Sequence, residues 1–445
     1  MKQKIIQISN STGAKLWRRA KKIIPGGGQL ISKRSERFLP NYWPAYYSRA
    51  KGCEVWDLDG RHYFDFAQMG VGSCILGYAD SEVDGQIKKA IQKGSMCTLN
   101  SPEEVRLAEL LVRLHPWAEM ARFARTGGEA CSIAVRIARA FSGRDKVAFC
   151  GYHGWHDWYL SANISNLKNL DGQLLPGLAP TGVPRGLRGA AFPFAYNKIE
   201  SLKQIVRLHG KSLAAIIMEP VRGESPLPGF LEAVRKIADK TNAVLIFDEV
   251  TSGFRMCVGG YHLITNVKPD IAVFAKGMSN GYPAAAVIGK RKVMNAAQDS
   301  FISSTSWTER IGSVAAIATI NKMQKKNVPK QLIKSGLKIQ SGLKKISVKR
   351  NVPLEISGIP PLIYLKFSTA QPAEAQTFYT QEMLKKGFLV GSAIYTTLAY
   401  SDHIISKFIS ASDEVFDKLG QYLISNSLKK HLLGEVIHAG FKRLT

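Results

Sequence analysis

The chain has 445 residues, of which 45% are hydrophobic and 21% charged, a composition typical of a soluble globular protein with two subdomains. No apolar run approaches the length that crosses a bilayer, which excludes a membrane span. The six cysteines are scattered without a CxxC pair, which argues against a zinc site or a disulfide framework. Because the opening MKQKIIQISN has too short an apolar patch for a signal peptide, we expect a cytoplasmic protein.

The net charge of +27 is concentrated in one stretch of the chain. From Lys322 to Arg350 there are ten basic residues and no acid. Lysines that recur every fourth position among apolar residues predict helices with one solvated face. The stretch lacks the interleaved aromatic residues of a base-stacking surface, so we expect no nucleic-acid partner. A preference for an anionic substrate stays open.

The first eighty residues predict one helix followed by short strands. Apolar positions indicate a helix over residues 12–24, which the run Pro25-Gly26-Gly27-Gly28 ends. Asp59-Gly60 between two strand-like runs indicates a hairpin. The expected strands are 45–48, 54–57 and 62–66, and a helical pattern follows at 81–93.

From residue 102 onward, helical and strand patterns alternate, which predicts βαβ units and a mainly parallel sheet. The expected helices are 102–114, 128–141, 198–208 and 229–240. The expected strands are 121–125, 146–149, 213–218, 243–247, 271–275 and 284–288, with an irregular stretch at 163–193. The C-terminal part differs: helices from about 309 to 350, strands at 354–356 and 362–367, and helices at 372–386 and 413–428 predict an α+β subdomain.

Two of the expected strands end in residues that can do chemistry. The run 243–247 delivers Asp248 and Glu249, and the run 271–275 delivers Lys276. Ligands bind beyond the carboxyl ends of such strands in open α/β sheets. An apolar run before Asp-Glu is also typical of an ATPase Walker-B strand, but the chain has no GxxxxGK[ST] loop. The remaining alternative is that Asp248 and Lys276 are ordinary polar residues at strand ends.

Two further motifs follow expected strands. In Arg125-Thr126-Gly127-Gly128-Glu129, the unpaired amides that open a helix can hold a phosphate. The same residues form a capping box, which needs no ligand and is compatible with a phosphate site.

The second motif is GYHGWHDW, residues 151–158, whose aromatic rings can stack on a flat ligand. His153, His156 and Asp157 in it raise the alternative of a metal site. A catalytic metal needs a further ligand and an ordered second layer of partners, which the sequence does not clearly offer, so we predict no metal.

Together these motifs specify one chemistry. Pyridoxal phosphate needs a lysine for its Schiff base, an Asp on its pyridine nitrogen and a held phosphate. The carboxylate keeps the ring protonated, and burial beside other cations lowers the pKa of the lysine so that it can act as a nucleophile.

The chain also resembles a known family, the class III aminotransferases among the fold-type I pyridoxal phosphate enzymes, and is most similar to their glutamate-1-semialdehyde aminomutase-like branch. The similarity covers about residues 24–318 and is weaker beyond. It is carried by the segments KGCEVWDLDGRHYFDF, RFARTGGEACSIAVRIARAFSGRDKVAFCGYHGWHD, IIMEPVRGE, LIFDEVTSGFR and FAKGMSNGYPAAAVIGKR. It implies an α/β fold in which residues 81–311 form a large, mostly parallel-sheet domain. The segments 1–80 and 312–445 would together form a smaller α+β domain.

The resemblance also implies a role for each site residue. Lys276 forms the internal aldimine and moves the proton between the substrate Cα and the cofactor C4′. Asp248 pairs with the pyridine nitrogen, Tyr152 stacks on the ring and Val250 packs on its other face. The remaining cofactor-binding residues are Thr126, Gly127 and Gly128 at the phosphate, His153, Glu219 as a nearby support, and Thr305, which reaches the cofactor phosphate of the neighbouring subunit and so implies a homodimer.

Departures from the family leave the substrate open. The phosphate loop reads TGGEA rather than SGTEA, and PGGGQLISKRSER lacks the SxxR spacing that grips the aminomutase substrate, so Lys33 and Arg34 become the candidate substrate residues. We expect an aminotransferase that works between an amino donor and a small-molecule or sugar-like carbonyl acceptor by a ping-pong mechanism. The alternatives are glutamate-1-semialdehyde 2,1-aminomutase or another intramolecular aminomutase, an amino-acid racemase or epimerase, and a non-catalytic paralogue.

Overall fold

The computed structural model describes residues 8–174, 176–441 and 444. The apolar patch weighed above as a signal peptide therefore falls mostly outside the described residues. The described residues divide into two compact units, one within Met1–Asp80 and Gln331–Thr445 and one within Ser81–Lys330. We call them the small and the large unit.

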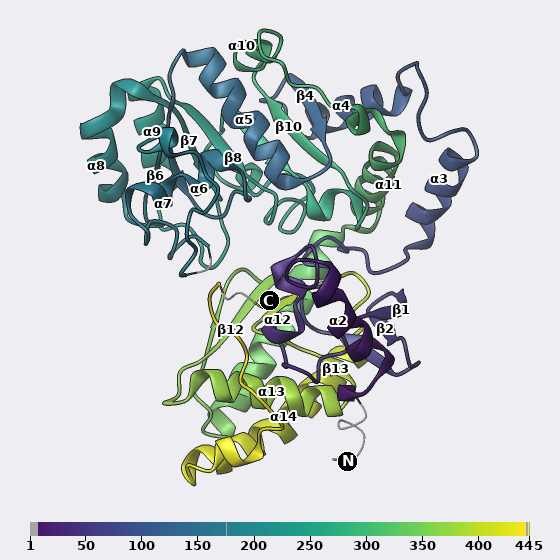
Figure 1. Cartoon of the computed structure of the whole chain (residues 1–445). Coiled ribbons are helices and arrows are strands. Elements are labelled where there is room, and N and C mark those ends of the chain that lie inside the picture. Colours follow the sequence, from purple (N-terminus) through teal and green to yellow (C-terminus); the bar gives the residue numbers. More distant parts are fainter. Residues whose placement is uncertain (1–7, 175, 442–443, 445) are drawn as a thin grey trace. The chain divides into compact units, whose positions relative to one another are not determined.

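The large unit contains a seven-stranded sheet (Figure 1). In spatial order its strands are β4 (Met120–Ala124), β10 (Ala285–Gly289), β9 (Ile271–Phe274), β8 (Val244–Asp248), β7 (Leu213–Met218), β5 (Lys146–Cys150) and β6 (Ala191–Pro193). β10 is antiparallel to both of its neighbours, and every other pairing is parallel. Six strands therefore point the same way, which confirms the predicted, mostly parallel sheet and brings their carboxyl ends to one edge.

Alternation along the strands produces a three-layer core. In β8, Val244 and Ile246 face the apolar cluster that includes helix α5, while Leu245 and Phe247 face the cluster that includes α8 and α9. All four side chains are at most 2% exposed. Burial of such a side chain stabilises the fold by roughly 2 kcal/mol, so this continuous apolar run is held in the middle of the sheet on both faces.

Helices cover both faces of this sheet, with α5 on one face and α8 and α9 on the other. They are α3 (Ser81–Ile91), α4 (Pro102–Leu114), α5 (Gly127–Ser142), α6 (Asp157–Leu160), α7 (Ala162–Ser165), α8 (Ile199–His209), α9 (Phe230–Thr241), α10 (Arg291–Met294) and α11 (Arg310–Lys326). α5 packs across β7, β8, β9 and β10 (Figure 1). Its apolar residues at helical spacing explain this position, since seven of them are buried.

The small unit combines the two ends of the chain. Its sheets have the orders β1-β2-β3-β13 and β11-β12-β14. The strands are β1 (Tyr47–Lys51), β2 (Glu54–Asp57), β3 (His62–Asp65), β11 (Leu354–Ser357), β12 (Leu362–Phe367), β13 (Phe388–Leu389) and β14 (Ala393–Tyr395), and the helices are α2 (Thr12–Ile23), α12 (Val328–Lys349), α13 (Pro372–Lys385) and α14 (Asp402–Ile424). Parallel pairing of β13 with β3 joins the N- and C-terminal segments, which confirms the smaller α+β domain.

Three features differ from the prediction. The second boundary falls after Lys330 rather than after residue 311, because α11 packs on α3 and α4 of the large unit. α14 begins at Asp402 rather than at residue 413, since the Ser401 side chain caps it by accepting a hydrogen bond from the Ile404 amide. The short strands β6, β13 and β14 were missed because two or three residues are too few to show an alternation of apolar and polar residues. These strands form only by pairing with distant strands.

The basic helices behave as predicted. Lys330, Lys334, Lys344 and Lys345 are exposed on α12, whereas Leu332, Ile339, Leu343 and Ile346 are buried. Leu337, expected on the buried side, is 52% exposed. Asp402 of α14 pairs with two lysines of this face, Lys338 at 3.0 Å and Lys334 at 3.5 Å. Within the described residues, no helix combines the length and apolar character needed to cross a membrane.

Candidate active site

The large unit places five predicted residues just beyond the carboxyl ends of five strands. Thr126 follows β4, Tyr152 follows β5, Glu219 follows β7, Asp248 ends β8 and Lys276 follows β9. Because these strands run in the same direction, the five residues lie at one edge of the sheet. β8 and β9 are neighbours with Asp248 opposite Val273, three residues before Lys276.

Lys276 begins a 3-10 turn, η6 (Lys276–Ser279), with a backbone φ of +40°. This left-handed conformation costs a non-glycine residue about 1 to 3 kcal/mol and is typical of functional positions. The Nζ atom donates a hydrogen bond to Thr251 Oγ1 at 2.8 Å. Loss of solvation lowers the pKa of Lys276 to about 8; the charges of Arg222 and Arg255 act in the same direction, and Glu219 and Asp248 oppose it. Near neutral pH, part of the population therefore carries a neutral amine.

Asp248 is held by three neighbours. Its Oδ1 accepts from the Val250 amide at 2.9 Å. Its Oδ2 lies 2.7 Å from His153 Nδ1 and accepts from the Cys131 thiol at 3.3 Å. Burial and Asp248 raise the pKa of Cys131 well above its usual value, so Cys131 stays a thiol donor. The carboxylate is 2% exposed and fixed in one orientation.

The metal alternative takes a different form in the structure. Cys131, His153 and Asp248, all buried, hold their ligand atoms within 4.8 Å of one another. Neither His156 nor Asp157 joins this group, although the sequence brought them under consideration. Since Asp248 Oδ2 is hydrogen-bonded to both of the others, a hydrogen-bond network accounts for the cluster without a metal.

The N-terminus of α5 forms a narrow cradle. Thr126 caps the helix, and the reciprocal bond from Glu129 completes the predicted capping box. The amides of Gly127 and Gly128 lie in the first turn, where a helix provides no acceptor for them. A Cβ on Gly127 would lie 2.8 Å from Val250, and one on Gly128 would lie 3.1 Å from the His156 ring. A side chain at Gly127 would force Val250 to move, and one at Gly128 would crowd the His156 ring, so glycine suits both positions.

Glu219 joins the loops that follow β5 and β7. Its Oε2 accepts from the Tyr152 amide at 3.0 Å and from Arg222 Nη1 at 3.1 Å. Gly151 has φ +117°, and a Cβ there would lie 2.6 Å from Glu219 Oε2. Glycine is therefore required for this approach. The Tyr152 ring is partly buried, and burial raises the pKa of its hydroxyl.

The remaining predicted residues are Thr305, Lys33 and Arg34. Thr305 is exposed and begins the turn η8 (Thr305–Thr308), which is tied to the start of α5 because Arg125 Nε donates to the Ser306 carbonyl at 2.9 Å. Lys33 and Arg34 belong to the small unit, where Lys33 ends a 3-10 turn and the Arg34 guanidinium packs against Gly26.

Sequence reasoning missed three residues: Cys131, Arg222 and Thr251. Arg222 stands in the quoted segment IIMEPVRGE and Thr251 in LIFDEVTSGFR. Both follow a predicted strand within a few residues, so a rule that selects every polar residue after a strand end would have found them. Nothing in the sequence connects Cys131 to Asp248, since 117 residues separate them.

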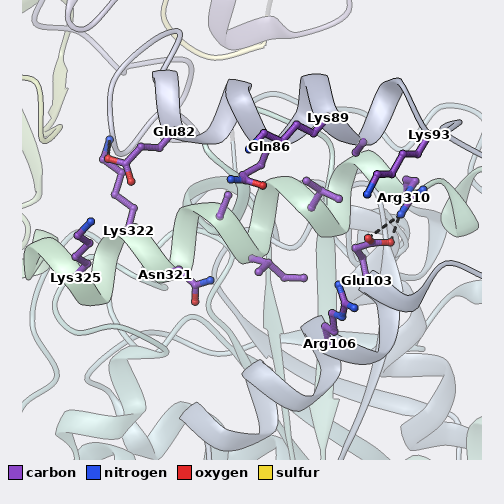
Figure 2. A pocket seen from close by; sticks show the side chains of 14 residues that line it. Glu82, Gln86, Lys89, Lys93, Glu103, Arg106, Arg310, Asn321, Lys322 and Lys325 are labelled. Carbon is purple, nitrogen blue, oxygen red and sulfur yellow. Dashed lines mark hydrogen bonds and ion pairs between the residues drawn. The ribbon is translucent and has the colours of Figure 1, made fainter.

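A separate hollow lies on the face of α11 that carries Arg310 and Lys322 (Figure 2). It has a volume of about 580 Å³ between α3, α4 and α11, and none of the predicted site residues lines it. Arg310 pairs with Glu103 at 2.8 Å and Lys322 with Glu82 at 2.9 Å at this hollow. Buried residues on the opposite side of α11 include Ala315 and Ala316. The hollow is thus separate from the edge that carries Lys276.

The edge fits the cofactor expected from the sequence. An added Cβ at Gly127 or Gly128 would meet neighbouring side chains, and the Nε2 atom of His153 is buried without a hydrogen-bond partner among the described residues. A buried carboxylate stands on one strand and an amine of lowered pKa stands on the next. These are the donor and acceptor groups that pyridoxal phosphate requires.

Comparison with known proteins agrees with this chemistry. The family model "Aminotransferase class-III" matches residues 39–414. A 3-aminobutyryl-CoA aminotransferase from Cloacimonas acidaminovorans is 34% identical over 79% of this chain and 82% of its own length. A glutamate-1-semialdehyde 2,1-aminomutase from Methanocaldococcus jannaschii is 29% identical over 91% of this chain and 97% of its own.

Among solved structures, the internal aldimine form of the FumI protein from Sphingopyxis sp. MTA144, with pyridoxal phosphate, has a TM-score of 0.84 and 27% identity. The match covers 93% of this chain and 97% of that one. The fold is therefore that of the fold-type I enzymes. With most of its length matched by the family model, the chain belongs to the class III aminotransferases, enzymes whose cofactor is pyridoxal phosphate.

Proposed function

We propose that the protein transfers an amino group between an amino donor and a small-molecule or sugar-like carbonyl acceptor in a ping-pong cycle. The observation that carries this proposal is Lys276, an amine with a pKa near 8 in a strained turn beside the buried carboxylate of Asp248. When bound, pyridoxal phosphate supplies an aldehyde that condenses with amines and a ring that withdraws electrons.

Lys276 is the base in this proposal. Its Nζ takes a proton from the substrate carbon that carries the amino group and returns it at the other end of the transfer. Thr251 Oγ1, 2.8 Å away, orients the amine. The lowered pKa supports this role because a base works best when its pKa lies near the working pH.

The other residues would bind the cofactor. Asp248 would hold the pyridine nitrogen, with His153 steadying its second oxygen. Tyr152 and Val250 would pack on the two faces of the ring. The amides of Gly127 and Gly128, with Thr126, would bind the phosphate at the positive end of α5. Glu219 would support Tyr152 through its backbone amide.

We further propose a homodimer in which Thr305 reaches the cofactor phosphate of the neighbouring active site. Its exposure, at the start of a turn tied to α5, is compatible with this role. A cytoplasmic location is part of the same proposal, since all six cysteines are free thiols.

One other activity has specific support. The 29% identity to a glutamate-1-semialdehyde 2,1-aminomutase extends over 91% of the chain, which favours an intramolecular aminomutase as the second candidate. The two can be separated chemically. A transaminase releases a keto product from its donor before it meets the acceptor, whereas an aminomutase returns the amino group to the same molecule.

The test uses the cofactor-loaded protein and a panel of amino donors. We expect the visible absorption of the bound cofactor to be lost with a suitable donor and restored by a carbonyl acceptor. Lys276→Ala should lower the transfer rate about a thousandfold or more, because the proton-transfer base is removed. Lys203→Ala, at an exposed lysine of α8, is the matched control. Undiminished transfer by Lys276→Ala, or a protein that fails to take up the cofactor, would contradict the proposal.

A further inference from the structure

We propose that His156 is a further ligand of the cofactor phosphate, and that its ring atom Nδ1 supplies the donor that the phosphate loop lacks at Gly128. This inference rests on the proposed function, because it adds a residue to the same cofactor site. It makes His156 a cofactor-binding residue and gives it no part in proton transfer.

The first argument concerns the donors that the helix terminus leaves open. Gly127 and Gly128 are the first two residues of α5, and their amides have no acceptor within the helix. The next amide, that of Glu129, already donates to Thr126 Oγ1 at 3.3 Å. Two backbone donors therefore remain at the positive end of this helix. A phosphate group has oxygen atoms for more donors than these two.

The second argument is the position of the His156 ring beside Gly128. The loop TGGEA has a glycine where the family loop SGTEA has a threonine, so position 128 supplies no hydroxyl. A Cβ built on Gly128 would lie 3.1 Å from His156 Cε1 and 3.2 Å from His156 Nδ1. The ring thus lies against the point from which a side chain at position 128 would start, with its Nδ1–Cε1 edge toward the helix.

The third argument is that this nitrogen has nothing to bond to in the protein. His156 Nδ1 is buried and lacks a hydrogen-bond partner among the described residues. His156 is the N-cap residue of α6, yet its side chain bonds to no amide of that helix. A buried polar nitrogen without a partner is destabilising, so a ligand that accepts from Nδ1 would remove this penalty.

The fourth argument is that the loop carrying His156 is tied to the first turns of α5. Trp158 Nε1 donates to Ser132 Oγ at 3.1 Å, and that hydroxyl donates to the Gly128 carbonyl at 2.9 Å. A Cβ on Gly154 would lie 2.8 Å from Gly128 Cα, so the two backbones meet without side chains between them. These contacts hold the ring beside the helix terminus, and a binding residue needs such support.

The charge state of His156 suits a donor. Burial lowers its pKa, while the charges of Glu129 and Asp157 act in the opposite direction. The ring is therefore mostly neutral near neutral pH, with one proton that either nitrogen can hold. An anion at the helix terminus would keep this proton on Nδ1.

The experiment measures the dissociation constants of pyridoxal phosphate and of pyridoxal with the full-length apoprotein, from the absorption of the bound compound. Pyridoxal lacks only the phosphate and still has the aldehyde that condenses with Lys276. For His156→Leu we expect the dissociation constant of pyridoxal phosphate to rise about tenfold to a hundredfold, the loss expected for a hydrogen bond to a charged group. The constant for pyridoxal should change by less than about threefold.

Two further variants serve as rescue and control. His156→Asn keeps an N–H donor on a short side chain and should recover part of the affinity for pyridoxal phosphate. His403→Leu, at an exposed histidine of α14, should leave both dissociation constants unchanged.

A second test moves the donor back to position 128. Gly128→Thr alone should weaken the binding of pyridoxal phosphate, because the new side chain meets the His156 ring. Gly128→Thr combined with His156→Ala should bind more tightly than either single variant, since the threonine hydroxyl then replaces the lost donor in the vacated space. Additive losses in the double variant would contradict the inference.

The outcomes separate the two proposals. If the wild-type protein binds neither compound, the proposed function fails. If it binds pyridoxal phosphate more tightly than pyridoxal, but His156→Leu changes both constants equally or changes neither, the function stands and the assignment of His156 is overturned.

Discussion

Asp248 and its neighbour in sequence, Glu249, are two buried carboxylates at one strand end with opposite surroundings. Asp248 is bonded to His153 and Cys131, and the free nitrogen of that histidine has no partner within the described chain. Glu249 accepts from the amide and the ring of His262 at 3.0 and 2.9 Å, and from the Ser252 hydroxyl. One network is left open for a ligand, and the other is closed.

The closed network continues through two more side chains. The Trp117 Nε1–H donates to His262 Nε2 at 2.8 Å, so the ring proton of His262 is on Nδ1, facing Glu249. The Gly260 amide donates to His115 Nε2 at 3.0 Å, so His115 donates from Nδ1 to the Leu111 carbonyl. Both rings are thereby fixed as neutral tautomers. The comparison teaches that burial of an acid does not by itself indicate function. A buried polar atom without a hydrogen-bond partner in the acid's network, such as His153 Nε2, is the better sign.

Of the changes that compare the two acids, Asp248→Asn should have the largest effect on activity. The substitution keeps the shape but removes the charge that would hold the pyridine nitrogen protonated, so amino transfer should fall about a hundredfold to a thousandfold. Steady-state kinetics and the cofactor dissociation constant measure the change. The stability of the fold should alter much less than the activity. Activity within a few-fold of wild type would remove Asp248 from the site.

Glu249→Gln should show the reverse pattern. Loss of a charged acceptor with three buried donors should lower the free energy of unfolding by about 2 to 3 kcal/mol, with amino transfer per folded molecule little changed. The shift of the urea midpoint reports the stability. Glu200→Gln, at an exposed position of α8, is the matched control. A large loss of turnover without a loss of stability would show that the closed network takes part in the chemistry.

The smallest expected effect is on pH dependence. Burial lowers the pKa of His115 from 6.5 to about 4. Between these values the unfolded chain binds more protons than the folded one, so stability should rise with pH from about 4 to 6.5 and be lost on acidification. Burial alone would raise the pKa of Glu249, but its bonds to His262 and Ser252 lower it. Its contribution is likewise lost as the pH falls through its folded pKa.

Thermal unfolding between pH 4 and 7 tests this linkage. His115→Asn should flatten the rise in melting temperature, since the substituted side chain does not titrate in this range. An unchanged slope in that variant would place the titrating groups elsewhere.

The sequence predicted the parts of the molecule in which local pattern and tertiary position agree. β7, β12 and α4 have the expected bounds, because continuous apolar runs and an amphipathic period are visible within each segment. Asp248 and Lys276 were found for the same reason, as polar residues at the ends of buried strands.

What the sequence did not reveal depends on contacts between distant residues. Cys131 meets Asp248 across 117 positions, and His115 meets the Gly260 amide across 145. Glu249 looked as reactive as Asp248 because the strand alone does not show which carboxylate meets a closed set of donors. Arg222 was overlooked although it follows a strand end, since its bond to Glu219 and its effect on the pKa of Lys276 exist only in the folded chain.

The central claim is that Lys276 is the lysine bonded to the cofactor, and it can be tested directly. Borohydride reduction of the cofactor-loaded protein makes that bond permanent, and mass spectrometry of its peptides then locates the phosphopyridoxyl group. We predict that the group lies on the peptide containing Lys276 and is absent from Lys276→Ala. Labelling of another lysine, such as Lys33, with Lys276 unmodified would contradict the account.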